Sequence, residues 1–414
     1  MKFEDFRLSP EIKQSLATLE FKKPTDIQYK AIPSILRGED VLAIAQTGTG
    51  KTAAFAIPVL EILSNHRNRR YSDIQCVVME PTRELVIQIS GVFQQIGKHL
   101  KLDILGLYGG VEQDPQIAKL KKGVDILVAT PGRLFDLVSQ GHIKLDQVKI
   151  LVLDEADHML DLGFIRDIRQ LIRHLPRQRQ TLFFSATINE EIKDLAYSLV
   201  YKPVRIQISP KDPISKNVDH YVSYINMDDK RFFLERLIKE NLDKKILVFV
   251  RTKVRAERVK SAMVRVDVLT ETIHGDKDQT ERNSAMKTFT SGEVKVLIAT
   301  DISSRGIDIA NIDFVVNYDL PELPENYVHR IGRTGRGVKR GSAITFCSEE
   351  EKPLLKEIEE FVGKPIKIIE FDKLNYQATI DFSDAKEYDM KALLKEAEEF
   401  DTMMEMKRKK RKKK

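Results

Sequence analysis

A glycine-rich turn between an apolar run and a helical pattern constrains this sequence more than any other feature. The run at 41–44 is typical of a short buried strand, and a helical pattern continues from Ala53 to about Leu63. In such a turn, the backbone N–H groups and the N-terminus of the following helix attract anions. A lysine in the turn reaches the β- and γ-phosphates of a nucleotide, and the threonine hydroxyl after it binds Mg²⁺. We predict a nucleoside-triphosphate site at the turn residues Gln46, Thr47, Gly48, Thr49, Gly50, Lys51 and Thr52.

A second apolar run, at 150–153, ends in the three carboxylates of Asp154, Glu155 and Asp157. At the tip of a strand beside the phosphate turn, Asp154 can hold Mg²⁺, and Glu155 can position and deprotonate the water that attacks the γ-phosphate. An Asp-Glu pair after an apolar run is otherwise often a helix N-terminus whose acids stabilise the helix dipole. Its combination with Gly50-Lys51-Thr52 favours the magnesium site.

Alternating strand and helix patterns predict an α/β fold with parallel sheets. In the first half, strand-like runs at 74–79, 103–108, 125–129, 150–153 and 181–184 alternate with helical patterns at 84–98, 132–140 and 164–174. After a proline-containing stretch at 203–217, similar runs follow at 220–225, 245–250, 268–273, 294–298, 314–317 and 342–346. Such alternation indicates sheets covered by helices on both faces, with ligands at the carboxyl ends of the strands.

We therefore predict two tandem domains, at 1–205 and 218–366, joined by a linker at 206–217 and followed by an extension at 367–414. Only the first domain has a phosphate-binding turn. Helices are expected at 350–362 and at 389–406. The apolar stripe of the second helix favours packing against the second domain over binding to a partner.

Composition bounds the class of protein. The 414 residues are 42% apolar and 31% charged, which indicates a globular chain, and the net charge is +6. The eight residues 407–414 are all Lys or Arg, so the rest of the chain carries 6 − 8 = −2. Cys76 and Cys347 lie in separate apolar runs, which predicts free thiols in a reducing cytoplasm. No signal sequence and no apolar run long enough to span a membrane is present, so we expect a cytoplasmic protein without a membrane span.

The sequence Asp154-Glu155-Ala156-Asp157 names the DEAD-box RNA helicases of superfamily 2, and the chain resembles this family from about residue 1 to 365. The family's other motifs are present in order, at 21–28, 45–52, 81–85, 109–110, 130–133, 185–187, 248–252, 274–282, 299–308 and 329–336. In this family the phosphate turn begins with alanine, as it does at Ala45. The short N-terminus and the lack of long accessory domains resemble compact bacterial members.

The resemblance implies two RecA-like domains that bind ATP and Mg²⁺. Phe21 is expected to stack on adenine while Thr25 and the Gln28 amide recognise its edge. The resemblance places Gly306 and Asp308 at the ribose of ATP. It assigns catalysis to Lys51, Asp154, Glu155, Arg333 and Arg336, with Mg²⁺ on Thr52 and Asp154; the two arginines would stabilise charge in the transition state.

The resemblance also implies an RNA partner. It assigns coupling between ATP and RNA to Asp157, Ser185, Thr187 and His329. Sequence-independent contacts to the RNA backbone are expected from Pro81, Thr82, Arg83, Gly109, Gly110, Thr130, Arg133, Arg251, Gly275 and Thr300. Contacts to the 2′-OH would favour RNA over DNA.

The predicted function is RNA-stimulated ATP hydrolysis coupled to local unwinding of short RNA duplexes or remodelling of ribonucleoproteins. Two alternatives remain open: an ATP-dependent RNA clamp with low turnover, and a DNA-directed translocase of superfamily 2. We expect a monomer without a membrane partner, acting on RNA that belongs to ribosomal or mRNA-decay assemblies.

The chain departs from the family pattern at three places. Glu20 stands where glycine is usual just past a helix end, and a left-handed conformation there would be strained. Glu80 stands where a small residue is usual, and its carboxylate is expected either to face the RNA groove or to face solvent. Ser303-Ser304 replaces the common alanine and is expected to be neutral. The basic tail at 407–414 either adds non-specific RNA affinity, which we favour, or serves only solubility.

Overall fold

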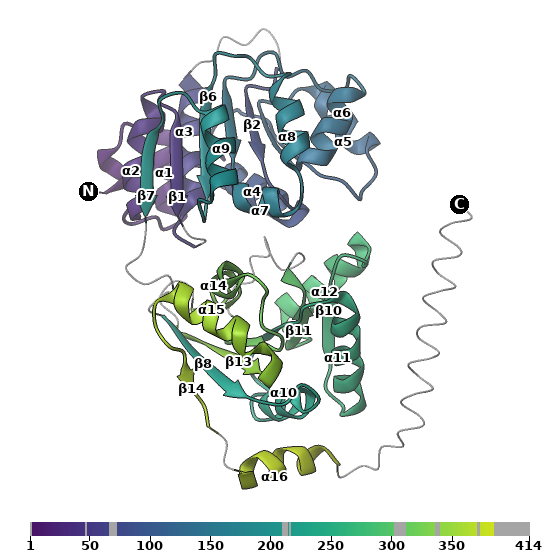
Figure 1. The fold of residues 1–414 in the computed structure, drawn as a ribbon. Helices are drawn as coiled ribbons and strands as arrows, with labels where there is room; N and C mark the ends of the chain where they lie inside the picture. Colours follow the sequence, from purple (N-terminus) through teal and green to yellow (C-terminus); the bar gives the residue numbers. More distant parts are fainter. Residues whose placement is uncertain are drawn as a thin grey trace.

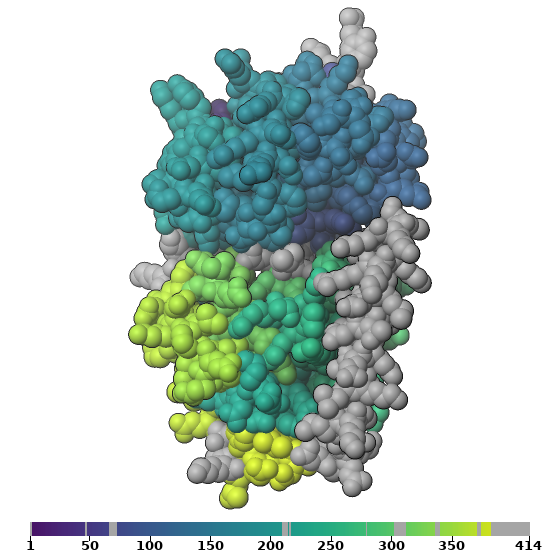
Figure 2. Space-filling view, turned by 45° about the vertical axis from the view of Figure 1, so that its right-hand side comes forward, coloured from purple at the N-terminus to yellow at the C-terminus, as the bar shows by residue number. Residues whose placement is uncertain are grey.

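The computed structural model of the protein describes residues 2–45, 48–65, 73–208, 214, 217–301, 312–335, 340–370 and 373–384. Within these residues the chain forms two α/β domains, each built on a seven-stranded parallel sheet (Figure 1). The space-filling view shows them as two lobes stacked one on the other (Figure 2). The prediction of two tandem parallel-sheet domains is confirmed.

The first sheet has the strand order β3-β4-β2-β5-β6-β1-β7. Its strands are β1 (Val41–Ala45), β2 (Cys76–Met79), β3 (Ile104–Leu107), β4 (Ile126–Ala129), β5 (Ile150–Leu153), β6 (Gln180–Ser185) and β7 (Val204–Ile208). Five of the seven strands are buried along almost their whole length, because helices cover both faces. Residues 204–208, which overlap the predicted linker, form the edge strand β7 and pair with β1.

Alternate residues of each strand enter two separate cores. One core joins the sheet to α1 (Pro10–Thr18), α2 (Asp26–Leu36), α3 (Lys51–Asn65) and α4 (Arg83–Ile96). The other joins it to α5 (Asp114–Lys122), α6 (Pro131–Ser139), α7 (Ala156–Asp161), α8 (Ile165–Ile172) and α9 (Glu190–Leu199). Val41 and Ala43 face the first core, and Leu42 and Ile44 the second, as the period of two along a strand requires.

The second sheet repeats the order of the first, as β10-β11-β9-β12-β13-β8-β14. Its strands are β8 (Val218–Tyr224), β9 (Ile246–Phe249), β10 (Thr270–Ile273), β11 (Val296–Ala299), β12 (Phe314–Asn317), β13 (Gly341–Cys347) and β14 (Lys367–Ile368). Position by position, β8 therefore corresponds to β1, β9 to β2 and β12 to β5. The alternating runs in the two halves of the sequence therefore form two copies of one topology.

Helices also cover both faces of the second sheet. One core contains residues of α12 (Gln279–Ser291), α14 (Pro324–Ile331) and α15 (Lys352–Val362), and the other contains residues of α10 (Lys230–Lys239) and α11 (Lys253–Arg265). A short 3₁₀ turn, η2 (Glu349–Glu351), leads into α15. None of the helices in the part of the chain described is long and apolar enough to cross a membrane.

The second domain continues beyond the predicted boundary at 366. Strand β14 pairs with β8, and α16 (Lys373–Asp384) lies against α10. The Tyr376 ring centroid is 4.8 Å from that of Phe233. Its hydroxyl accepts a hydrogen bond from the Asn226 N–H and donates one to Asp229. The predicted helix at 389–406 and the basic tail lie outside the described residues.

Glu20 has the strained left-handed conformation. Its φ is 58°, in the left-handed region, directly after α1. In this conformation the N–H of Phe21 reaches the carbonyl of Leu16 at 2.9 Å, which closes the helix end. Phe21 then packs edge-on against Phe3 at a centroid distance of 5.7 Å. The placement of Phe21 thus depends on a non-glycine residue with positive φ.

We expect Glu20→Gly to increase the free energy of unfolding by about 1 kcal/mol, because glycine removes the left-handed strain at a smaller cost in unfolded-state entropy. Urea denaturation followed by circular dichroism measures this. The matched variant Gly38→Ala places a side chain at φ 80° in open space and should shift stability in the opposite direction. A loss of stability in Glu20→Gly would contradict the strain argument.

Candidate nucleotide site and nucleic-acid interface

The phosphate turn joins β1 to α3 as predicted. Gly48 and Gly50 have φ values of 82° and 92°, which only glycine adopts without strain. Lys51 is the first residue of α3, and only 5% of its surface is exposed. Its Nζ has no hydrogen-bond partner. A buried ammonium group at a helix N-terminus is suited to binding an anion.

Gln28 connects the predicted adenine motif to this turn. Its Oε1 accepts a hydrogen bond from the Thr25 N–H, and its Nε2 donates one to the Gly50 carbonyl. A Cβ on Gly50 would lie 2.5 Å from the Gln28 Nε2, so this position requires glycine. The amide retains one acceptor site and one donor for a ligand. Adenine recognition by Phe21, Thr25 and Gln28 stays a prediction.

The carboxylates of the predicted magnesium site lie beside Lys51. Asp154 follows β5 and is 3% exposed, and its Oδ1 accepts a hydrogen bond from the Glu155 N–H. Glu155 has a φ of 50°, and its Oε1 lies 3.5 Å from the Lys51 Nζ. Burial raises the pKa of Asp154 to about 7. Burial would also raise the pKa of Glu155, but Lys51 and His329 outweigh it and lower the pKa to about 2.

These residues fit a Mg²⁺ ion that is shared with a nucleotide. Among the described residues, no group of three His, Cys, Asp or Glu side chains could hold a metal. Asp154 and the half-buried Thr52 would therefore need phosphate oxygens and water as further ligands, which is how Mg²⁺ is often bound in nucleotide sites.

The second domain places two further residues near the same site. His329, near the end of α14, and Arg333, just after it, both lower the pKa of Glu155, so they lie close to it across the domain boundary. Arg333 is 8% exposed. Within the first domain, the Asp157 Oδ2 accepts hydrogen bonds from the N–H and the hydroxyl of Thr187. The structure thus brings together three of the four predicted coupling residues; Ser185 ends β6, with its hydroxyl buried and unpartnered.

The predicted RNA-contacting residues of the first domain follow β2, β3 and β4. Thr82 caps α4 by accepting a hydrogen bond from the Leu85 N–H. Arg83 lies so close to Gly110 that a Cβ there would clash with its guanidinium. Arg133 donates to the Val111 carbonyl. Pro81, Gly109 and Thr130 complete this set at the same edge of the sheet.

The predicted RNA-contacting residues of the second domain are Arg251 after β9, Gly275 after β10 and Thr300 after β11. An ion pair of 2.7 Å between Glu84 and Arg282 joins the two sets across the domain boundary. Burial and the charge of Arg282 lower the pKa of Arg83. Two guanidinium groups close enough for one to lower the pKa of the other favour binding of an anion between the domains.

Comparisons with known proteins identify the family. The DEAD/DEAH box helicase model matches residues 25–195, and the helicase conserved C-terminal domain model matches residues 229–338. The chain belongs to the DEAD/DEAH box helicase family.

Two relatives illustrate the similarity of this helicase to curated proteins. The ATP-dependent RNA helicase RhlB of Shewanella frigidimarina is 42% identical over 381 residues, covering 90% of this chain and 87% of RhlB. The DEAD-box ATP-dependent RNA helicase CshA of Geobacillus kaustophilus is 40% identical over 359 residues, covering 86% of this chain and 76% of CshA.

Two solved structures are similar in fold. S. cerevisiae Dbp5 bound to RNA and ADP BeF3 aligns with a TM-score of 0.81 at 31% identity, covering 92% of this chain and 100% of Dbp5. Mss116 bound to ssRNA and UDP-BeF aligns with a TM-score of 0.82 at 28% identity, covering 93% of this chain and 82% of Mss116. The RecA-like fold expected from the sequence is therefore confirmed for this helicase.

Five predicted residues of the helicase lie outside the described residues: Gln46, Thr47, Gly306, Asp308 and Arg336. Sequence reasoning also missed residues that build the site. Arg330 is 2% exposed and forms a bidentate ion pair with Asp301, and Arg282 bridges the domains. Neither role follows from residue type or spacing alone.

Neither expectation for Glu80 is right: its carboxylate faces neither the RNA groove nor solvent. Glu80 is fully buried, and neither of its carboxylate oxygens has a hydrogen-bond partner. Its backbone pairs with β4, and the neighbouring Met79 carbonyl accepts a hydrogen bond from the Asp154 N–H. Burial, and then the charges of Asp154 and Glu155, raise the pKa of Glu80 well above its usual value. This helicase therefore has an additional carboxyl group beside its DEAD motif.

We expect Glu80→Gln to stabilise the nucleotide-free protein more at high pH than at low pH. The pKa in the folded state lies above the ordinary glutamate value of 4.5, so the native state loses stability as the pH rises from about 4.5 towards the folded-state pKa. Glutamine removes this loss because it does not ionise. Urea denaturation in a chelator at about pH 5 and about pH 8 measures the difference.

The exposed residue Glu112 in the same domain provides the control. Glu112→Gln should change the free energy of unfolding by a similar small amount at both pH values. An equal effect of Glu80→Gln at both pH values would show that the buried carboxyl group does not ionise in this range.

Proposed function

We propose that this helicase hydrolyses ATP between its two domains when RNA is bound, and that closure of the domains separates short RNA duplexes locally. The observation that carries the proposal is the environment of Glu155. Its carboxylate lies 3.5 Å from the Lys51 Nζ of the first domain and is influenced by His329 and Arg333 of the second. Similarity to ATP-dependent RNA helicases at about 40% identity supports the same activity.

The residues of the first domain suit phosphoryl transfer to water. Lys51 and the N–H groups at the start of α3 bind the phosphates, and the buried position of Lys51 strengthens that attraction. Glu155 is held ionised by its cationic neighbours, so it can accept a hydrogen bond from the attacking water. Mg²⁺ on Thr52 and Asp154 would neutralise charge on the phosphate oxygens. Arg333 supplies positive charge from the opposite domain.

Asp157 and Thr187 provide a physical connection from this site to the rest of the first domain. Their two hydrogen bonds tie the DEAD segment to the segment after β6. A change at Glu155 can therefore shift both segments together, and His329 faces the same carboxylates from the second domain. We propose that Asp157, Ser185, Thr187 and His329 couple the nucleotide state to the relative position of the domains.

The proposed RNA path runs over the loops that hold Arg83, Gly110 and Arg133 in the first domain and Arg251, Gly275 and Thr300 in the second. Their guanidinium groups, hydroxyls and exposed N–H groups grip a sugar–phosphate backbone without reading bases. We further propose that the protein is a cytoplasmic monomer and that its RNA belongs to ribosomal or mRNA-decay assemblies. The ion pair between Glu84 and Arg282 brings the proposed RNA-binding loops of the two domains together within one chain, so both can contact one RNA.

ATP hydrolysis measured at low salt without polymer, with single-stranded RNA and with single-stranded DNA tests the function. We expect strong stimulation by RNA alone. Equal stimulation by DNA would instead support a DNA-directed translocase. RNA binding that requires ATP but is accompanied by negligible turnover would support an RNA clamp.

Glu155→Gln should lower the RNA-stimulated kcat by roughly 10²–10⁴-fold, because the amide cannot accept the proton of the attacking water. RNA affinity in the presence of a non-hydrolysable ATP analogue should remain, since the side chain keeps its size. Steady-state ATPase and fluorescence anisotropy measure the two quantities. Glu190→Gln, at an exposed position on α9, is the control. Undiminished turnover in Glu155→Gln would rule out the proposed role.

A further inference from the structure

The second domain contains a counterpart of the phosphate site of the first. Because the two sheets have the same strand order, the connection from β8 to α10 corresponds to that from β1 to α3. Lys51 is the first residue of α3, and Lys230 is the first residue of α10. Both lysines are buried, with exposures of 5% and 0%. The residues after β12 correspond in the same way to the DEAD segment after β5.

The two lysines differ in their partners. The Lys51 Nζ has no hydrogen bond, which leaves it able to bind a ligand. The Lys230 Nζ donates to the Tyr318 carbonyl at 2.7 Å and to the Glu351 Oε2 at 2.5 Å. Glu351 ends η2 and is 2% exposed. The site in the second domain is therefore closed by a carboxylate of the chain itself.

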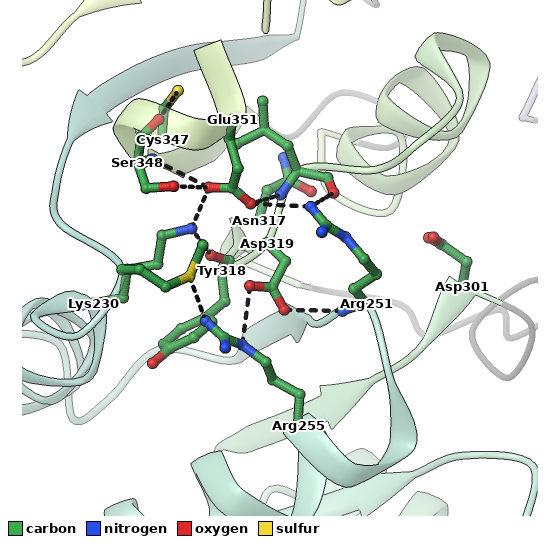
Figure 3. Close-up of polar contacts among 12 residues, drawn as sticks. Lys230, Arg251, Arg255, Asp301, Asn317, Tyr318, Asp319, Cys347, Ser348 and Glu351 are labelled. Atoms are coloured by element: carbon green, nitrogen blue, oxygen red, sulfur yellow. Dashed lines mark hydrogen bonds and ion pairs between the residues drawn. The ribbon is translucent and has the colours of Figure 1, made fainter. Parts of the chain in front are cut away.

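Glu351 accepts hydrogen bonds from five donors, as Figure 3 shows. Its Oε2 receives Lys230, the Ser348 N–H and the Ser348 hydroxyl. Its Oε1 receives the Leu320 N–H at 3.1 Å and the Arg251 guanidinium at 3.2 Å. A lysine, an arginine, a hydroxyl and two backbone N–H groups are the donors that hold phosphates in nucleotide sites. Here the Glu351 carboxylate takes the place of the phosphate.

The same carboxylate holds Arg251, the arginine of the proposed RNA path. The Arg251 guanidinium also donates to the Leu320 carbonyl, and its backbone N–H donates to Asp319. Asp319 in turn forms an ion pair of 3.0 Å with Arg255 (Figure 3). One end of Arg251 is fixed on buried groups, while 37% of its side chain stays exposed. Fixing an arginine before binding reduces the entropy lost when it contacts RNA.

We propose that Glu351 is a positioning residue for RNA binding: its carboxylate fills the anion site of the second domain and directs Arg251 towards the RNA backbone. Lys230 supports it by neutralising the buried charge. The inference rests on the proposed RNA contact of Arg251. It also explains why a domain with a lysine at this position offers no open phosphate site there.

The test compares Glu351→Gln, Arg251→Ala and the double variant in the full chain. Lys230 donates a hydrogen bond, so the oxygen of the amide introduced at position 351 would face Lys230. The NH₂ group of that amide would then face Arg251 and could not accept its hydrogen bond, so the Arg251 side chain would no longer be held. We expect each single variant to weaken binding of single-stranded RNA about 10-fold with a non-hydrolysable ATP analogue present. The dependence of log K on log[salt] should fall by about 0.7, the value for one phosphate contact.

The double variant separates positioning from a merely structural role. If Glu351 acts through Arg251, the double variant binds RNA as weakly as Arg251→Ala alone. Additive losses, or unchanged RNA affinity in Glu351→Gln, would overturn the inference. Unchanged affinity in Arg251→Ala would instead show that the proposed RNA contact fails. Glu357→Gln, at an exposed position on α15, controls for the loss of one negative charge.

A second variant covers the case in which Glu351→Gln does not fold. Replacing a buried ion pair by apolar side chains of similar volume is often neutral for stability, so Lys230→Met combined with Glu351→Met should fold. We expect the same loss of RNA affinity and of salt dependence as in Arg251→Ala. Wild-type RNA affinity in this folded variant would overturn the inference.

Discussion

The burial of the Lys51 ammonium group is the interaction on which the first domain depends. Removing a charged group from water is costly unless the group is paired, and the Lys51 Nζ has no hydrogen-bond partner. Burial lowers its pKa, but the carboxylates of Glu155, Asp154 and Asp157 outweigh burial and raise it. These acids follow β5, and Lys51 follows β1, so parallel strands place them at the same edge of the sheet. The carboxylates offset the burial of the lysine, and its Nζ keeps N–H donors with which it can bind an anion.

The two domains share one topology, but the buried lysine at the start of the corresponding helix has different partners in each. In the first domain the lysine faces Glu155 at 3.5 Å and stays available. In the second, Glu351 and the Tyr318 carbonyl accept hydrogen bonds from two of the three N–H donors of the lysine. The difference depends on one carboxylate supplied from η2, far along the chain. A closed site gives the second domain a rigid anchor for its arginines.

The sequence predicted the parts of this structure that depend on local pattern. Apolar runs located the strands because both faces of each sheet are covered, and the glycine, lysine and carboxylate motifs located the phosphate site. The burial of Glu80 differs from both expectations, which placed its carboxylate in the groove or in solvent. The alternation along β2 indicates burial at position 80, since Cys76 and Val78 face the core that contains α3.

Other features could not be predicted because they depend on contacts between distant segments. Lys230 and Glu351 are 121 positions apart, and no local pattern connects them. The same applies to Glu84 and Arg282, which meet only when the domains pack together. β7 was assigned in part to the linker because an edge strand with one exposed face lacks a continuous apolar run. The extension through α16 was missed because a few contacts, mainly of Tyr376, hold it to the second domain.

The distribution of charge across the domain boundary favours closure. In the first domain, three carboxylates of the DEAD segment act on one lysine, so the site has an excess of negative charge. The second domain presents His329 and Arg333 to the same carboxylates. Bound nucleotide phosphates would add further negative charge at this position. Arg333 and a divalent cation would then stabilise the site by neutralising that charge. The position of the second domain is therefore linked electrostatically to the presence of nucleotide in the first. An RNA strand bound by both domains would be affected when the nucleotide changes their relative position.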